Sequence, residues 1–118
     1  MGLIHARYND IEFDMVGEVL VQSSSSLLKA KIGALKSYLN KDKNLLPIII
    51  AEYLSSERRE QCREQGIFYI DLSGNIYIKH KGIYVEREGF PDRVSPFSFV
   101  FSFFLWQFSY RHLLKQHW

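Results

Sequence analysis

The stretch from Pro47 to Asp71, PIIIAEYLSSERREQCREQGIFYID, decides the fold class of this chain. It opens with the unbroken apolar run Ile48–Ala51, which is typical of a buried strand in a parallel sheet. A helix is predicted next, because Ser55 or Ser56 can cap its start and Gly66 can end it. A second apolar segment closes the stretch, which therefore predicts strand, helix and strand in succession.

The predicted helix is almost wholly polar, and Cys62 is its single candidate for the interior. A small buried hydrophobe is a commoner state for a free cysteine than a reactive thiol, and we favour it. One cysteine cannot form a disulfide within the chain, which excludes a disulfide-stapled secreted scaffold. We expect a protein of the reducing cytoplasm.

The alternation of predicted strands and helices extends upstream. Met15–Val21 is rich in β-branched residues and predicts a strand, and the serines Ser23–Ser26 end it. Leu27–Asn40 follows as a helix, because its leucines and isoleucine recur with helical spacing. These residues form one apolar face: Leu28, Ile32, Leu35 and Leu39.

Downstream, Ile76–His80 and Ile83–Arg87 predict a hairpin with a two-residue loop. Such a loop places Ile78 opposite Val85, with both side chains on the core face. The whole pattern predicts an α/β domain: a mixed sheet flanked by two helices and ending in an antiparallel meander.

Composition restricts the function classes. The 118 residues suit one domain, and 47% hydrophobic types exclude a disordered chain. A net charge of +2 is too small to predict strong, non-specific DNA binding. Lys29, Lys36 and Lys43 are seven residues apart beside the apolar helical face, which is typical of a solvated rim. If the domain contacts DNA, these lysines are the candidate phosphate contacts, and binding should be weak.

Residues 47–67, together with Tyr69–Asn75 and Gly82–Arg87, resemble the AbiEi-type antitoxins of bacterial type IV toxin–antitoxin systems. Those proteins are transcriptional regulators in which a nuclease-like region typically precedes a winged helix. That region resembles the PD-(D/E)xK, or restriction-endonuclease-like, fold. The resemblance covers roughly Phe13 to Arg87, and it implies a nuclease-like domain over residues 1–90.

The resemblance also implies where a nuclease site would lie. Such sites hold a divalent cation between two carboxylates beside a lysine. Asp14 is the candidate for the first carboxylate, but Leu20 and Gln22 occupy the expected acid and lysine positions. This departure favours a non-catalytic domain without a metal. The alternative is a Mg²⁺- or Mn²⁺-dependent endonuclease in which Asp14 and Glu18 bind the metal and Gln22 stands in the lysine position.

Asp71, Gly74 and Asn75 form a polar cluster with two interpretations. The residues can belong to a binding surface, or they can form a tight turn, for which glycine and asparagine are typical. We favour the turn.

Residues 91–118 predict an aromatic-rich tail in place of a winged helix. Its apolar run, Phe97–Phe108, is shorter than the ~20 residues that span a bilayer. It can be a helix on the domain's own sheet, an oligomerisation or membrane-interface segment, or a tail from an altered reading frame that replaced the winged helix of the resembled family. Packing against protein is favoured, because so much exposed aromatic surface promotes aggregation.

Taken together, these features predict a non-catalytic nuclease-like domain, a remnant of an antitoxin regulator that contacts nucleic acid or a partner protein. Its partners are expected to be DNA, bound weakly, and protein or a second copy, bound through the tail. The endonuclease is the alternative.

Overall fold

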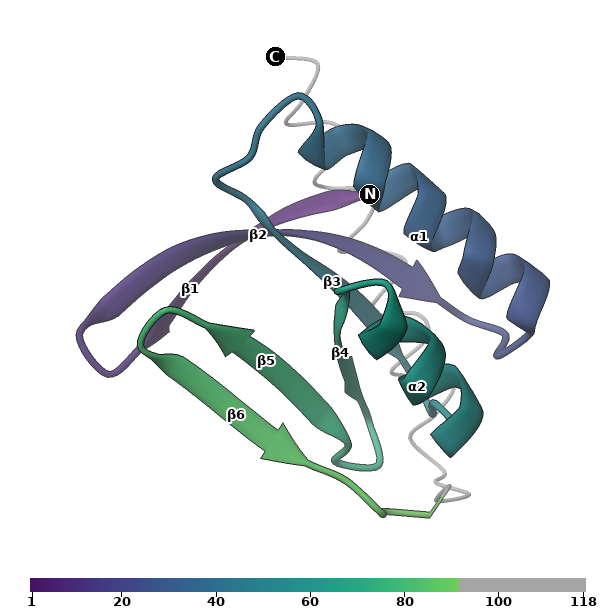
Figure 1. Ribbon diagram of the computed structural model, residues 1–118. Helices are drawn as coiled ribbons and strands as arrows, with labels where there is room; N and C mark the ends of the chain where they lie inside the picture. Colours follow the sequence, from purple (N-terminus) through teal and green to yellow (C-terminus); the bar gives the residue numbers. More distant parts are fainter. Residues whose placement is uncertain (92–118) are drawn as a thin grey trace.

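The computed structural model describes residues 1–91, which form a six-stranded sheet and two helices (Figure 1). The elements follow one another as β1 (Gly2–Tyr8), β2 (Ile11–Leu20), α1 (Ser25–Leu39), β3 (Leu46–Ala51), α2 (Ser56–Glu64), β4 (Phe68–Asp71), β5 (Ile76–His80) and β6 (Ile83–Arg87).

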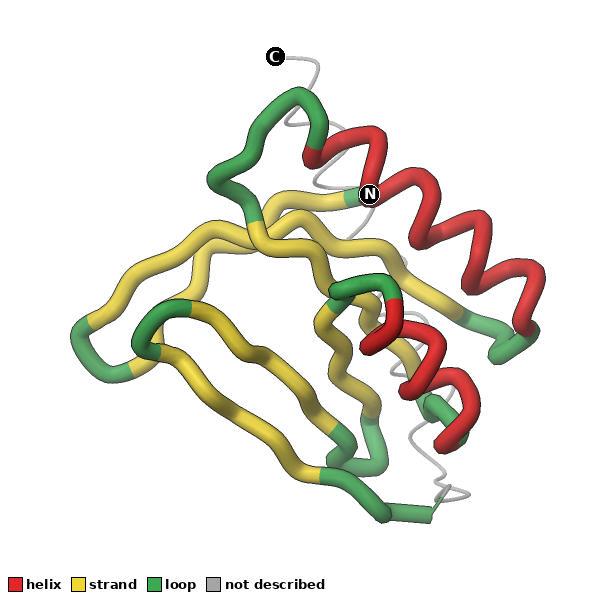
Figure 2. The backbone as a smooth tube through the Cα atoms, in the orientation of Figure 1, coloured by secondary structure: helices red, strands yellow, loops and turns green. Residues whose placement is uncertain are grey.

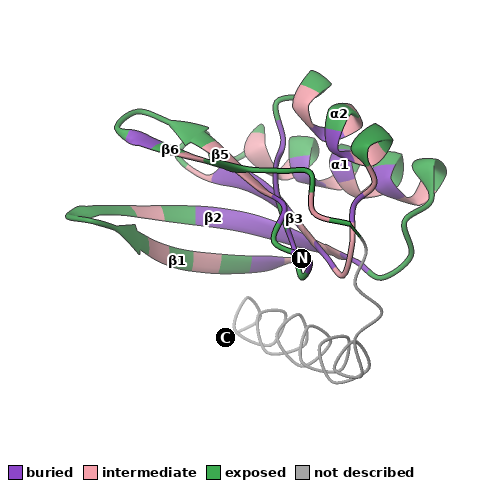
Figure 3. Ribbon diagram, turned by 90° about the horizontal axis from the view of Figure 1, so that it is seen from below, coloured by how far each residue is buried: buried purple, intermediate pink, exposed green. Residues whose placement is uncertain are grey.

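The strands have the same order in the sheet as in the chain (Figure 2). The central strands β2, β3 and β4 are parallel, and the remaining pairings are antiparallel. Helices α1 and α2 connect the parallel strands and lie on the same face of the sheet (Figure 3). Two crossover connections with the same handedness that advance in the same direction across a sheet place their helices on the same face. The predicted mixed α/β sheet with two helices and a final meander is confirmed.

The edge strand β1 is an addition to this prediction, since no strand was expected before Met15. It pairs with β2, which begins at Ile11, and His5 lies opposite Asp14. The alternation of a strand is present: Ile4 and Ala6 are half-buried, whereas Leu3, His5 and Arg7 are exposed. The pattern is hard to see in the sequence, because apolar Leu3 lies on the exposed face with His5 and Arg7.

The first core lies between the helices and the sheet. Leu28, Ile32 and Leu35 are buried on α1, as predicted, and Leu39 is half-buried. Burial of each such side chain stabilises the fold by roughly 1.5–3 kcal/mol. The sheet, α2 and the loops complete this core with Val16, Leu20, Ile49, Ala51, Leu54, Cys62, Ile67 and Tyr69.

The opposite face of the sheet carries a second core, formed by Met15, Leu46, Ile48 and Phe68. The sheet curls until the tips of its outer hairpins, β1–β2 and β5–β6, meet (Figure 1). A Cβ atom on Gly82 would lie only 2.9 Å from Cδ1 of Ile11. Gly82 also has a φ of +76°, which glycine adopts without strain. Its two-residue turn sets Ile78 opposite Val85, so the predicted register is confirmed.

Helix α2 begins and ends as the sequence predicts. The Ser55 hydroxyl accepts a hydrogen bond from the first turn, and Gly66 follows the helix with a φ of +70°. Cys62 is buried and free, and burial raises its pKa to about 12, so it is present as the unreactive thiol. Arg59 is also buried, which was not predicted, and its guanidinium donates to the Leu54 carbonyl at 2.9 Å.

The predicted aromatic tail falls outside the described residues from residue 92 onward. Within residues 1–91, none of the helices is long and apolar enough to cross a membrane.

Candidate functional site

The two carboxylates of the alternative metal site lie on β2. Asp14 and Glu18 share the face of the strand that turns toward the helices, because they are an even number of residues apart. Four residues of a strand span about 13 Å, whereas two ligands of one Mg²⁺ each lie about 2.1 Å from the ion. The structure therefore does not bring Asp14 and Glu18 together.

Asp14 pairs with the neighbouring strand. Its Oδ1 lies 2.7 Å from Nδ1 of His5, and both side chains are largely exposed. The hydrogen bond to Asp14, with the negative charges of Asp14 and Glu12, raises the pKa of His5 above its ordinary value. This pairing was not predicted, because β1 itself was not predicted.

Glu18 is buried and already neutralised. Its carboxylate lies 3.2 Å from Nζ of Lys31 on α1 and 3.7 Å from the amino group of Met1. Beyond it, Leu20 belongs to the first core, and Gln22 is exposed in the turn after β2. The side chain at the expected acid position thus packs against apolar residues. Among residues 1–91, no group of three or more His, Cys, Asp or Glu side chains is placed to hold a metal.

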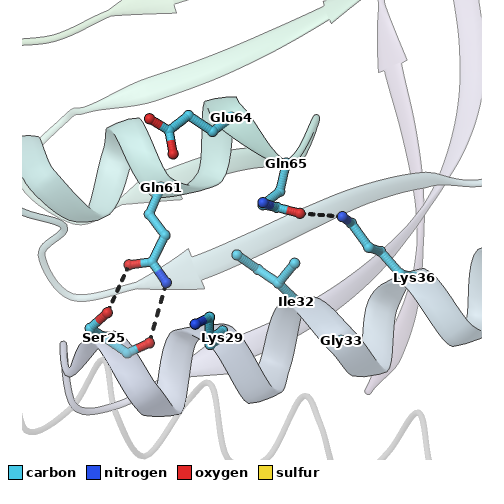
Figure 4. A pocket seen from close by; sticks show the side chains of 8 residues that line it. All are labelled: Ser25, Lys29, Ile32, Gly33, Lys36, Gln61, Glu64 and Gln65. Carbon is cyan, nitrogen blue, oxygen red and sulfur yellow. Dashed lines mark hydrogen bonds between the residues drawn. The ribbon is translucent and has the colours of Figure 1, made fainter.

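A groove of about 390 Å³ separates α1 from α2 and is open to solvent (Figure 4). We call it the interhelical groove. Lys29 and Lys36 lie along its α1 side, so the structure brings together two of the three candidate phosphate contacts. Lys43 does not join them, because α1 ends at Leu39 and Lys43 lies in the following turn. The other lining residues are Ser25, Ile32, Gly33, Gln61, Glu64 and Gln65.

Glutamine side chains from α2 and from the residue that caps its C-terminus bridge the interhelical groove (Figure 4). Gln61 accepts from the Ser25 hydroxyl and donates to the Ser25 carbonyl, both at 3.3 Å. Gln65 accepts a hydrogen bond from the ammonium group of Lys36. Lys29 makes no hydrogen bond or ion pair with any residue in the described part of the chain, so its charge is available to a ligand.

The lining of the groove includes Gly33, in the middle of α1. A Cβ atom there would meet nothing within 4 Å, so the packing of the protein does not require a glycine. Glycine inside a helix costs about 0.5–1 kcal/mol relative to alanine. Its absent side chain leaves the helix backbone open to close approach by another molecule. The polar α2 sequence signalled an exposed helix, but it did not show that Gln61 and Gln65 face the lysines.

Asp71, Gly74 and Asn75 form the turn between β4 and β5. Asp71 accepts hydrogen bonds from the Leu54 N–H at 3.0 Å and from the Asn75 N–H at 2.9 Å. The Asn75 side chain donates to Asp71 at 2.8 Å and is fully buried. Gly74 has a φ of +106°. Because these groups hydrogen-bond one another inside the protein, the cluster ties the ends of β3, β4 and β5 together.

Comparison with protein families, with curated proteins and with solved structures finds no match to this chain. The relationship to AbiEi-type antitoxins therefore stays a prediction from the sequence, and function must be argued from the groove and the carboxylates.

Proposed function

We propose that this chain is a non-catalytic, nuclease-like binding domain that contacts the phosphate backbone of nucleic acid in the interhelical groove. The observation that carries the proposal is the pairing of Lys29 and Lys36 on one side of that groove. The two carboxylates that catalysis would need are separated and engaged with other residues. The proposal includes the restriction-endonuclease-like fold and the origin of the domain in an antitoxin regulator.

The charge of the groove supports weak binding. Lys29 and Lys36 are two turns of helix apart, about 10.5 Å along the axis, so they can contact different phosphates. Glu64 on the α2 side repels phosphate, which limits the favourable charge. Two groove lysines, with Lys43 beyond the helix end, imply a slope of log affinity against log salt between about −2 and −3.

The experiment is a salt titration of binding to a fluorescently labelled DNA duplex and to the matching single strand. We expect Lys29→Gln/Lys36→Gln to abolish most of the binding and flatten the salt slope. The matched control is Lys79→Gln/Lys81→Gln, which removes the same charge from the distant end of β5 and its turn. Equal losses in the two double variants, or an unsubstituted slope near −8, would contradict binding in the groove.

A further inference from the structure

An aliphatic row crosses the sheet on the face opposite the helices. Val19 pairs with Ile50, Ile50 with Ile70, and Ile70 with Ile76, so four adjacent strands contribute one side chain each. The residues that alternate with them, such as Tyr69, belong to the helix-side core, which places the row on the other face. We call these four residues the isoleucine row.

The isoleucine row is incompletely covered by the described part of the chain. Both described helices lie on the other face of the sheet (Figure 3). The hairpin tips meet near Gly82 and Ile11, at the opposite end of the parallel strands. Ile70, in the middle of the row, is 36% exposed, and its three partners are half-buried. Apolar rows of this kind are typical of surfaces that another segment or molecule covers.

The described part of the chain ends beside this row. Arg87, the final residue of β6, pairs with Ile76. Three residues later, Phe90 is held by hydrogen bonds to Asn75, the neighbour of Ile76. From residue 91, five extended residues reach about 17 Å, and the row spans about 14 Å across three strand spacings. Residue 96 can therefore lie over any strand of the row.

The sequence that begins at this distance is strongly apolar. Residues 96–108 contain six phenylalanines, one tryptophan and no charged residue. We propose that residues 96–108 of this chain pack against the isoleucine row and cover this face of the sheet. The inference is independent of nucleic-acid binding in the interhelical groove, which lies on the other face.

Tryptophan fluorescence tests the proposal directly, because both tryptophans of the chain, Trp106 and Trp118, lie outside the described domain. In the full chain carrying Trp118→Phe, emission comes from Trp106 alone. We expect it to be that of a buried indole and to be protected from acrylamide. Ile70→Asp places a charge in the row and should shift the emission to longer wavelength and increase quenching. Circular dichroism confirms that the domain stays folded, and Ile70→Ser replaces Ile70→Asp if the charge prevents folding.

Leu3→Asp is the matched control. Leu3 is 37% exposed, like Ile70, but it pairs with Val16 on the helix-side face. It should leave the emission of Trp106 unchanged. Equal shifts in the two variants, or solvent-exposed emission in the parent chain, would overturn the proposal. If the emission changes with protein concentration and the chain dimerises, a second copy covers the isoleucine row, and the proposal is overturned. Burial of Trp106 only on addition of phosphatidylglycerol vesicles would assign the segment to a membrane surface, which also overturns the proposal.

Discussion

Asn75 and Phe90, fifteen residues apart, hold each other by two reciprocal hydrogen bonds. The Asn75 amide donates to the Phe90 carbonyl at 3.1 Å, and its oxygen accepts from the Phe90 N–H at 3.1 Å. The same amide donates to Asp71, so one buried side chain joins the β4–β5 turn to the segment after β6.

Replacing Asn75 with alanine should strongly destabilise the domain. The change removes three side-chain hydrogen bonds and leaves buried partners unsatisfied, at a cost of about 3 kcal/mol. Thermal and urea unfolding measure the loss. Asn44→Ala, at an exposed turn position, is the control and should change stability by less than about 0.5 kcal/mol. Similar effects of the two substitutions would contradict the structural role of the Asn75 side chain.

Gly82→Ala should destabilise the domain through two effects. The left-handed backbone costs about 1–2 kcal/mol for a non-glycine residue, and the new methyl group would also displace Cδ1 of Ile11, the flexible end of an exposed side chain, at a smaller cost. Gly89→Ala separates the effects, because Gly89 has a φ of +87° and open space around its Cβ position. The difference in unfolding free energy between the two variants reports the contact of the hairpin tips. A Gly82→Ala variant that is as stable as the unsubstituted protein would contradict the left-handed conformation of this turn.

The His5–Asp14 pair should make a small contribution to stability that depends on pH. Because the folded-state pKa of His5 is raised, this contribution is complete below the unfolded pKa of about 6.5 and is lost as pH rises through the folded pKa. Nuclear magnetic resonance titration of His5 checks the direction. Asp14→Asn should lower the pKa of His5, whereas Asp10→Asn, at a fully exposed position, should have a smaller effect. An unchanged His5 titration in Asp14→Asn would show that the pair does not form in solution.

The purified protein should not cleave DNA with Mg²⁺ or Mn²⁺. Asp14 and Glu18 are too far apart for one ion, and Glu18 is neutralised by Lys31 inside the fold. Plasmid nicking assays across metal concentrations measure this. Metal-dependent nicking that disappears in Asp14→Ala or Glu18→Ala would establish the endonuclease alternative.

Local patterns predicted much of the fold. Leu28, Ile32 and Leu35 identify the buried face of α1, because helical spacing alone places them together. Ile78 and Val85 reveal their register through the length of one turn. These relationships depend on residues a few positions apart, where periodicity and turn geometry act directly.

The remaining features depend on residues distant in the chain. Gln61 faces Ser25 across the interhelical groove only because two crossovers place both helices on one side of the sheet. Phe90 reaches Asn75 only after the meander returns. Arg59 is buried although arginine normally lies at the surface, because its guanidinium finds the Leu54 carbonyl. No spacing rule encodes such contacts.

The identical order of strands in the chain and in the sheet has a kinetic consequence. Each strand after β1 pairs with the strand that precedes it in the chain, so no pairing skips a strand, although β2–β3 and β3–β4 each close a crossover that contains a helix. Folding can advance from one edge of the sheet to the other, and the two parallel pairings are its slow steps, because each brings together residues that are distant in the chain. During synthesis, β1 and β2 can form a hairpin before the rest of the domain has left the ribosome, and each later strand meets a finished edge.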